Sequence, residues 1–133
     1  MSKFSPALII ALAAGTFAGS SLALTSAEYD AARDRINADY RTAKAACDKL
    51  KGNAEDICEE EAKGKRNIAR AELEYQREPT EQNARAVELA KAKAAYEVAE
   101  ERCDELKGEA EDRCEAEARA TYNASVDRIR GTK

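Results

Sequence analysis

The feature that most constrains this chain is an internal duplication that carries all four cysteines. Segment 47–62 aligns with segment 103–118, and twelve of the sixteen aligned positions are identical. Each copy spaces its cysteines eleven residues apart, with Gly52 or Gly108 about midway between them. Two copies are too few for a solenoid, so the pattern predicts one supersecondary unit that occurs twice.

The unit is predicted to be a helical hairpin that turns at its glycine. Ahead of each glycine, apolar and alanine positions recur at spacings of three and four residues, which is typical of an a/d helical seam. These positions are Ile36, Tyr40, Ala43, Cys47 and Leu50 in the first copy, and Leu89, Ala92, Tyr96, Ala99, Cys103 and Leu106 in the second. Glycine tolerates the left-handed conformation in which helices end. We therefore expect turns at Gly52 and Gly108, with Asn53 capping the second helix.

The cysteine spacing predicts which cysteines pair. In an unbroken helix, residues eleven apart are separated by about 16.5 Å, far beyond the roughly 7 Å that a disulfide can span. In a hairpin, the same two residues face each other near the turn. Four cysteines allow three pairings, and the duplicated spacing favours Cys47–Cys58 and Cys103–Cys114.

A metal centre is the competing use of these cysteines, but the sequence gives it little support. Zinc sites use histidine or closely spaced thiolates, and the chain has no histidine and no C-x-x-C motif. Two acidic groups could bind Ca²⁺ weakly, although the EF-hand pattern is absent and a solvated helix face explains them better; they are Asp56, Glu59 and Glu60, and Asp112, Glu115 and Glu117. We expect no catalytic residue, no cofactor and no metal site, and therefore no enzyme.

The fold is predicted to be all-α, with four helices over residues 25–51, 54–77, 80–107 and 110–129. Pro79 separates two hairpin modules, 24–78 and 79–133, because the residue before a proline disfavours the helical conformation. Thr25 and Glu28 form a capping-box pattern. Large apolar residues are scarce, so we expect a thin core held by disulfides, either as a thin bundle or as an extended coiled-coil-like array.

Residues 1–23 are predicted to be a cleaved signal peptide. Lys3 precedes an apolar run over residues 7–18, and Ser21 and Ala23 fit a small-x-small cleavage site after Ala23. A second candidate site lies at residues 25–27. The run is too short and too interrupted for a spanning helix, which needs about 20 apolar residues. We expect no stable membrane span after cleavage.

The remaining chain is acidic and its charges are interspersed. Without Lys3, the chain has 21 basic and 26 acidic residues, which gives a net charge of −5. An acidic chain is not attracted to nucleic acid, and interspersed charge is typical of a solvated helix surface.

The signal peptide, the segment 29–33 (YDAAR) and the repeated C-D-x-L-K-G-x-A-E-D-x-C-E modules together resemble a group of small exported proteins of Gram-negative bacteria. These are often labelled TolA-like or cell envelope biogenesis proteins. The resemblance implies a periplasmic location. The main hypothesis is a non-enzymatic envelope protein that acts through protein–protein contacts, as a scaffold, spacer or stress-related factor. The alternative is a small holdase-type chaperone. The envelope partner is unknown, and association into a homo-oligomer stays open.

Overall fold

The structure is a computed structural model, and it describes residues 24–131. The described chain forms four antiparallel helices: α1 (Ser26–Cys47), α2 (Asn53–Arg77), α3 (Glu81–Cys103) and α4 (Glu109–Gly131). The predicted all-α fold of two disulfide-stapled hairpins is confirmed. The predicted signal peptide lies outside the described residues.

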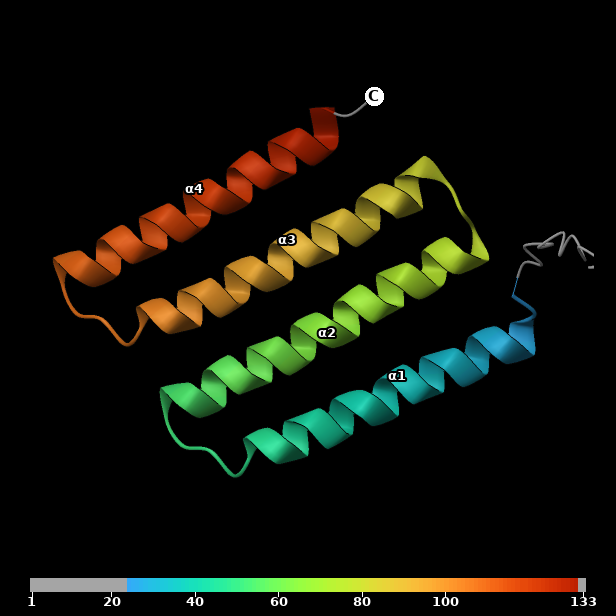
Figure 1. The fold of residues 1–133 in the computed structure, drawn as a ribbon, viewed down its shortest axis with the longest axis horizontal. Coiled ribbons are helices and arrows are strands. Elements are labelled where there is room, and N and C mark those ends of the chain that lie inside the picture. Colours follow the sequence, from blue (N-terminus) through green and yellow to red (C-terminus); the bar gives the residue numbers. More distant parts are fainter. Residues whose placement is uncertain (1–23, 132–133) are drawn as a thin grey trace, which may run out of the picture.

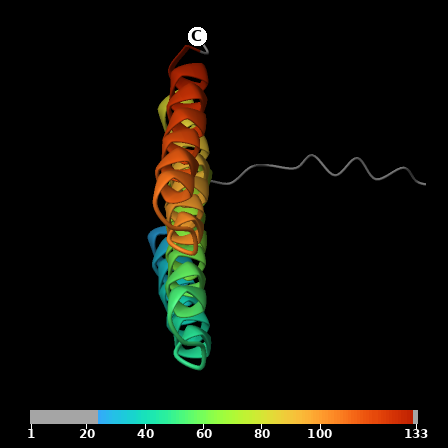
Figure 2. The same cartoon turned by 90° about the vertical axis from the view of Figure 1, so that its left-hand side faces the viewer.

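The helices lie side by side in one layer rather than in a closed bundle. Contacts join α1 to α2, α2 to α3, and α3 to α4, and no other pair of helices within residues 24–131 is in contact. Figure 1 shows the four helices in chain order across the layer, and Figure 2 shows them edge-on, one behind another. Of the two predicted arrangements, the fold is therefore the extended array.

The sequence of α2 explains why the layer is flat. Ala62 and Gly64 are both buried, although residues two apart lie about 200° apart around a helix of 3.6 residues per turn. Ala62 lines a groove with residues of α1, whereas Gly64 lies against Ala94 of α3. A helix that is buried on two opposite sides has one neighbour on each side. α1, α2 and α3 therefore lie in a row.

The helix starts follow ordinary capping chemistry in two cases. Thr25 and Glu28 form the predicted capping box at the start of α1. The Thr80 hydroxyl accepts a hydrogen bond from the backbone amide of Asn83 at the start of α3. Both threonines satisfy amides that the first turn of a helix leaves without partners.

The predicted ends of the first and third helices are wrong by four residues. α1 ends at Cys47 and α3 at Cys103, and each is followed by a tight turn in which the amide of Leu50 or Leu106 donates to the carbonyl of the preceding cysteine. The disulfide favours this early end, because the chain must reverse within the ten residues between the two cysteines. Leu50 and Leu106 therefore leave the predicted seam and are each 41% exposed.

The turns depend on glycine at the point where the second helix of each hairpin begins. Gly52 and Gly108 both have φ of 59°, and no other residue of the described chain has positive φ. Gly52 itself is the N-cap of α2, without a side-chain cap. The predicted cap at Asn53 is wrong: this residue is already helical, and its side-chain amide nitrogen is buried without a hydrogen-bond partner.

Candidate functional site

The stapled turns are the most sharply built features of the molecule. Disulfides join Cys47 to Cys58 and Cys103 to Cys114, each with a Cα–Cα distance of 5.5 Å. The first cysteine of each pair is almost fully buried. The predicted pairing is confirmed, and because both sulfurs of each pair are bonded, neither pair offers a thiolate to a metal or a substrate.

A cluster of three carboxylates lies beside each disulfide. In the first turn, carboxylate oxygens of Asp48, Glu55 and Glu59 lie within 4.8 Å of one another. The second turn repeats the cluster with the residues at the same positions of the second copy, Asp104, Glu111 and Glu115. Both clusters lie at the same end of the layer, at the left in Figure 1.

These clusters differ from the acidic groups that the sequence suggested. Of the two predicted groups, Glu59 and Glu115 alone belong to the clusters. Residues 55 and 59 share a helix face because they are four apart, and Asp48 approaches from the turn, which could not be anticipated before the end of α1 was known. Three carboxylates could supply part of the six to eight oxygen ligands that Ca²⁺ takes. The clusters are exposed or half-buried, as solvated acidic groups often are, and the absence of a metal site stays a prediction.

The two clusters differ in their neighbouring charge. Lys44 of α1 forms an ion pair with Glu59 across the first hairpin, and this hydrogen bond raises the pKa of Lys44 above its usual value. The residue at the matching position of the second copy is Glu100, which accepts a hydrogen bond from the hydroxyl of Tyr96. The cation that partly neutralises the first cluster is therefore replaced by a further carboxylate in the second module.

Besides the two clusters at the turns, acidic side chains also gather around Glu101 of α3. Burial raises the pKa of Glu101 on α3, and the carboxylates of Asp104, Asp56 and Glu60 raise it further. Asp56 and Glu60, which the sequence grouped with Glu59, are thus among the carboxylates that raise the pKa of Glu101, whereas Glu59 belongs to the cluster at the first turn.

The two seam tyrosines at matching positions have different partners. The guanidinium of Arg66 lies 4.1 Å from the centre of the Tyr40 ring, a cation–π contact. Tyr96 instead stacks on Tyr122, with ring centres 5.0 Å apart. Arg66 and Tyr122 are themselves matching positions of the two copies. The predicted role of both tyrosines in packing between helices agrees with this geometry.

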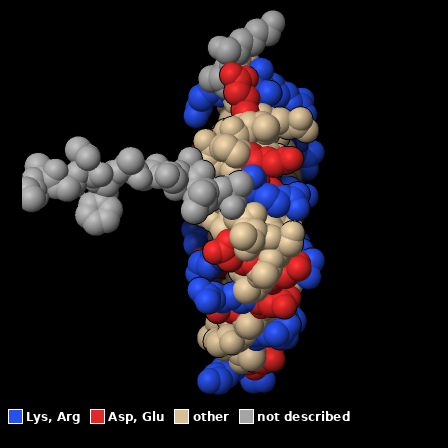
Figure 3. Space-filling model, turned by 90° about the vertical axis from the view of Figure 1, so that its right-hand side faces the viewer, with Lys and Arg blue, Asp and Glu red and all other residues tan. Residues whose placement is uncertain are grey.

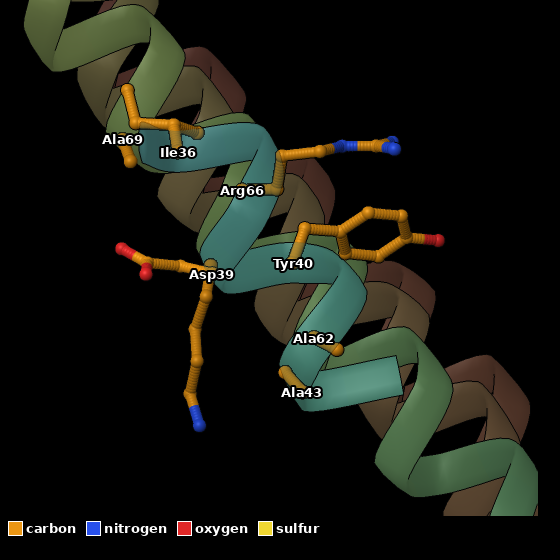
Figure 4. A pocket seen from close by; sticks show the side chains of 8 residues that line it. Ile36, Asp39, Tyr40, Ala43, Ala62, Arg66 and Ala69 are labelled. Atoms are coloured by element: carbon orange, nitrogen blue, oxygen red, sulfur yellow. The ribbon is translucent and has the colours of Figure 1, made fainter. Parts of the chain in front are cut away.

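An apolar groove lies beside Tyr40 between α1 and α2. Its volume is about 240 Å³, and it is lined by Ile36, Asp39, Tyr40, Ala43, Ala62, Lys65, Arg66 and Ala69. Figure 4 shows Tyr40 and Arg66 extending to one side of the groove and Asp39 to the other. Ligand sites commonly have volumes of about 300–1,000 Å³, so this groove is small for a substrate or cofactor and has the size of a single side chain.

The chemistry of these features gives no nucleophile–base pair. The sequence has no histidine, and the described cysteines are all paired. Acidic and basic side chains are mixed over the side of the molecule seen in Figure 3. That the protein is not an enzyme stays a prediction.

None of the helices in residues 24–131 is both long enough and apolar enough to cross a membrane. Comparisons with known protein families, with characterised proteins and with solved structures find no match to this chain.

Proposed function

We propose that this protein is a non-enzymatic protein of the bacterial periplasm that acts through protein–protein contacts in the envelope, as a scaffold, spacer or stress-related factor. The observation that carries the proposal is the open layer. α2 and α3 each have helical neighbours on two opposite sides, which leaves the two broad faces of the layer uncovered by the rest of the described chain. A layer of this kind offers far more surface for contacts than a closed bundle of the same mass.

The broad faces carry charged side chains that suit a polar partner. Lys65 and Glu72 are exposed on one face of α2, seven residues apart, and Asp56 and Arg70 are exposed on the opposite face. Transient interfaces are about as polar as the rest of a protein surface. We therefore propose a folded envelope protein with mixed surface charge as the partner.

Two observations support the compartment. Disulfides persist in oxidising compartments, among them the bacterial periplasm, and this chain has two. The resemblance of the repeated modules to small exported proteins of Gram-negative bacteria supports the same location.

Site-specific photo-crosslinking in the periplasm tests the proposal. A photoreactive residue is placed at Lys65 or Glu72 for one face, and at Asp56 or Arg70 for the other. The expected result is one discrete adduct that forms from positions on a single face. The matched control carries the same residue in a chain whose four cysteines are replaced by serine, and should give no such adduct. Absence of a discrete adduct from all four positions would contradict the proposal.

The alternative is a holdase-type chaperone, and one observation bears on it. Leu50 and Leu106 are exposed in the two stapled turns, and these turns lie at the same end of the layer (Figure 1). Holdases need large exposed apolar patches, and two leucines are few. The intact protein should therefore fail to suppress aggregation of a heat-unfolded client, as measured by light scattering. Suppression that disappears in the double variant Leu50→Ser and Leu106→Ser would favour the chaperone.

A further inference from the structure

Each outer edge of the layer corresponds, by its position in the repeat, to one side of the contact between the two modules. The two copies form the same hairpin, with the disulfide and the turn glycine at matching positions, so matching residues take the same position around their helices. The side of α2 that packs on α3 therefore corresponds to the outer edge of α4. In the same way, the side of α3 that packs on α2 corresponds to the outer edge of α1. A second copy of this chain could in principle extend the layer by placing its α1 against α4, and the side chains decide whether it does.

The closest point of the module contact cannot be repeated at the edges. A Cβ atom at Gly64 would lie 2.7 Å from the Cβ of Ala94, so α2 and α3 approach as closely as they do because residue 64 is glycine. The matching edge residues are Ala120 on α4 and Ala38 on α1. Two alanines in this arrangement would bring their Cβ atoms equally close together, which real Cβ atoms essentially never show.

The large aliphatic side chains of the module contact are also missing from the edges. On the Gly64 side of α2 and the Ala94 side of α3, the aliphatic residues are buried or half-buried; they are Ile57, Ile68, Val87 and Val98. Their matching residues at the outer edges are all exposed and are small or polar; they are Arg113, Ala124, Ala31 and Thr42. The apolar area that drives association of the modules is therefore absent where a further copy would dock.

One ion pair of the module contact becomes a like-charge pair at the edges. Lys63 of α2 lies 3.7 Å from Glu97 of α3. The matching residues are Arg119 on α4 and Arg41 on α1, so two arginines would meet where the modules place opposite charges.

The other ion pair of the module contact is lost as well. Arg102 of α3 lies 3.3 Å from Glu61 of α2. Its matching residues are Ala46 on α1 and Glu117 on α4, which form no pair. Steric fit, apolar area and charge thus all differ between the module contact and the two edges, and all differ in the direction that weakens association.

We infer that the outer edges of α1 and α4 are terminating edges, which retain the register of the module contact but carry side chains that prevent a second copy of this chain from extending the layer. Polar outer faces on terminal units play this role in repeat proteins. The inference goes beyond the proposed function and does not depend on it, because it concerns contact of the chain with itself.

Two half-restored chains test the inference. The first restores the α1 edge with Ala31→Val, Arg41→Glu and Thr42→Val. The second restores the α4 edge with Arg113→Ile, Ala120→Gly and Ala124→Ile. In analytical ultracentrifugation, the unmodified chain and each half-restored chain alone should have the mass of one chain. An equimolar mixture should contain a 1:1 dimer, since one restored α1 edge meets one restored α4 edge and the two remaining edges stay closed.

The matched control places similar substitutions on exposed alanines that lie off the edges, namely Ala54→Ile, Ala86→Val and Ala95→Val. Mixed with either half-restored chain, this control should stay at the mass of one chain. Circular dichroism establishes that every chain is helical before it is mixed.

Three results would overturn the inference. The first is a dimer or larger assembly of the unmodified chain that Ala38→Glu or Ala120→Glu dissociates, because the natural edges would then associate. The second is a mixture of folded half-restored chains that stays at the mass of one chain. The third is association of the control chain as strong as that of the half-restored pair, because added apolar area anywhere would then suffice.

Discussion

Gly64 lies in the middle of α2, where a glycine weakens a helix by about 1 kcal/mol relative to alanine. Its place is explained by packing, since the added Cβ would lie 2.7 Å from the Cβ of Ala94. At this residue, helix propensity and packing between the modules therefore act in opposite directions, and the contact distance indicates that packing is the larger effect.

Replacing Gly64 by alanine is expected to destabilise the protein. Overpacking typically costs about 1–3 kcal/mol, and the gain in helix propensity returns about 1 kcal/mol. A net loss of up to about 2 kcal/mol should lower the melting temperature by several degrees in a thermal melt. Gly131→Ala is the control, because a Cβ there meets nothing within 4 Å. Adding Ala94→Gly should restore part of the loss, and a Gly64→Ala variant more stable than the parent would contradict the packing argument.

The contribution of Glu101 to the stability of the fold is expected to depend on pH. Burial, together with Asp104, Asp56 and Glu60, raises the pKa of its carboxyl group. The folded state therefore binds this proton more tightly than the unfolded state does. The free energy of unfolding accordingly falls as pH rises from the usual carboxyl range through the raised pKa. At neutral pH the ionised side chain weakens the fold.

Glu101→Gln is therefore expected to stabilise the protein at pH 7, by up to about 1 kcal/mol for a partly solvated group. The difference should vanish below about pH 4, where the carboxyl is protonated in both states. Thermal melts of the two chains across this range provide the measurement, with the exposed turn residue Glu105→Gln as the control. A variant less stable than the parent at pH 7 would show that Glu101 makes a favourable contact instead.

Single residues show clearly what could be predicted from sequence. The turn glycines and the cysteine pairs both follow from the spacing of the cysteines. Two cysteines eleven residues apart in an unbroken helix are too far apart to form a disulfide, so the chain must turn between them. Gly64 could have been noticed as a glycine among strong helix formers, but its partner Ala94 lies in the other module. Asn53 was misassigned because α2 begins one residue earlier than expected, so that Gly52 takes the cap position.

At the scale of the helices, the two disulfides have the largest expected effect. Each closes a loop of about a dozen residues, for which the chain-entropy model gives roughly 3 kcal/mol. Total stability in domains of this size is about 5–15 kcal/mol. Each helix also contacts only one or two neighbouring helices, so few other interactions compensate for the loss of a staple.

Serine at both Cys47 and Cys58, or at both Cys103 and Cys114, should each lower the free energy of unfolding by about 3 kcal/mol in urea titrations. Loss of both disulfides should abolish cooperative unfolding while far-ultraviolet circular dichroism still reports substantial helix, because the helix propensity of the sequence is high. Unchanged unfolding midpoints in both double variants would refute the claim that the staples hold the fold.

The helices themselves could be predicted from the sequence. The sides of α2 and α3 that pack on each other could not. The seam toward the disulfide partner contains tyrosine, isoleucine and cysteine at regular spacing. The seam between modules has Gly64 of α2 against Ala94 of α3 at its closest point, with a few isoleucines and valines on either side. Because alanine is abundant all around these helices, that pattern does not stand out from the composition, and bundle and array remained equally compatible with the sequence.

At the scale of the whole molecule, the single layer should be measurable in solution. Helices of about 25 residues are roughly 37 Å long, and four of them spaced about 8–10 Å apart form a plate about 10 Å thick. Such a plate has a radius of gyration of about 16 Å, whereas a compact domain of this length has about 13 Å. Small-angle X-ray scattering of the chain without residues 1–23 should give the larger value. The smaller value would indicate that α1 and α4 close into a bundle.

The small number of buried residues has a thermal consequence. Among residues 24–131, six hydrophobic side chains are buried: Cys47, Ala62, Leu73, Val87, Cys103 and Val126. The heat-capacity change of unfolding grows with the apolar area that becomes exposed, and is about 12–15 cal/mol/K per residue in ordinary domains. Calorimetry of this protein should give a smaller value. Its stability curve should therefore be flatter than that of a globular domain, so that warming or cooling away from the optimum changes its folded population only gradually.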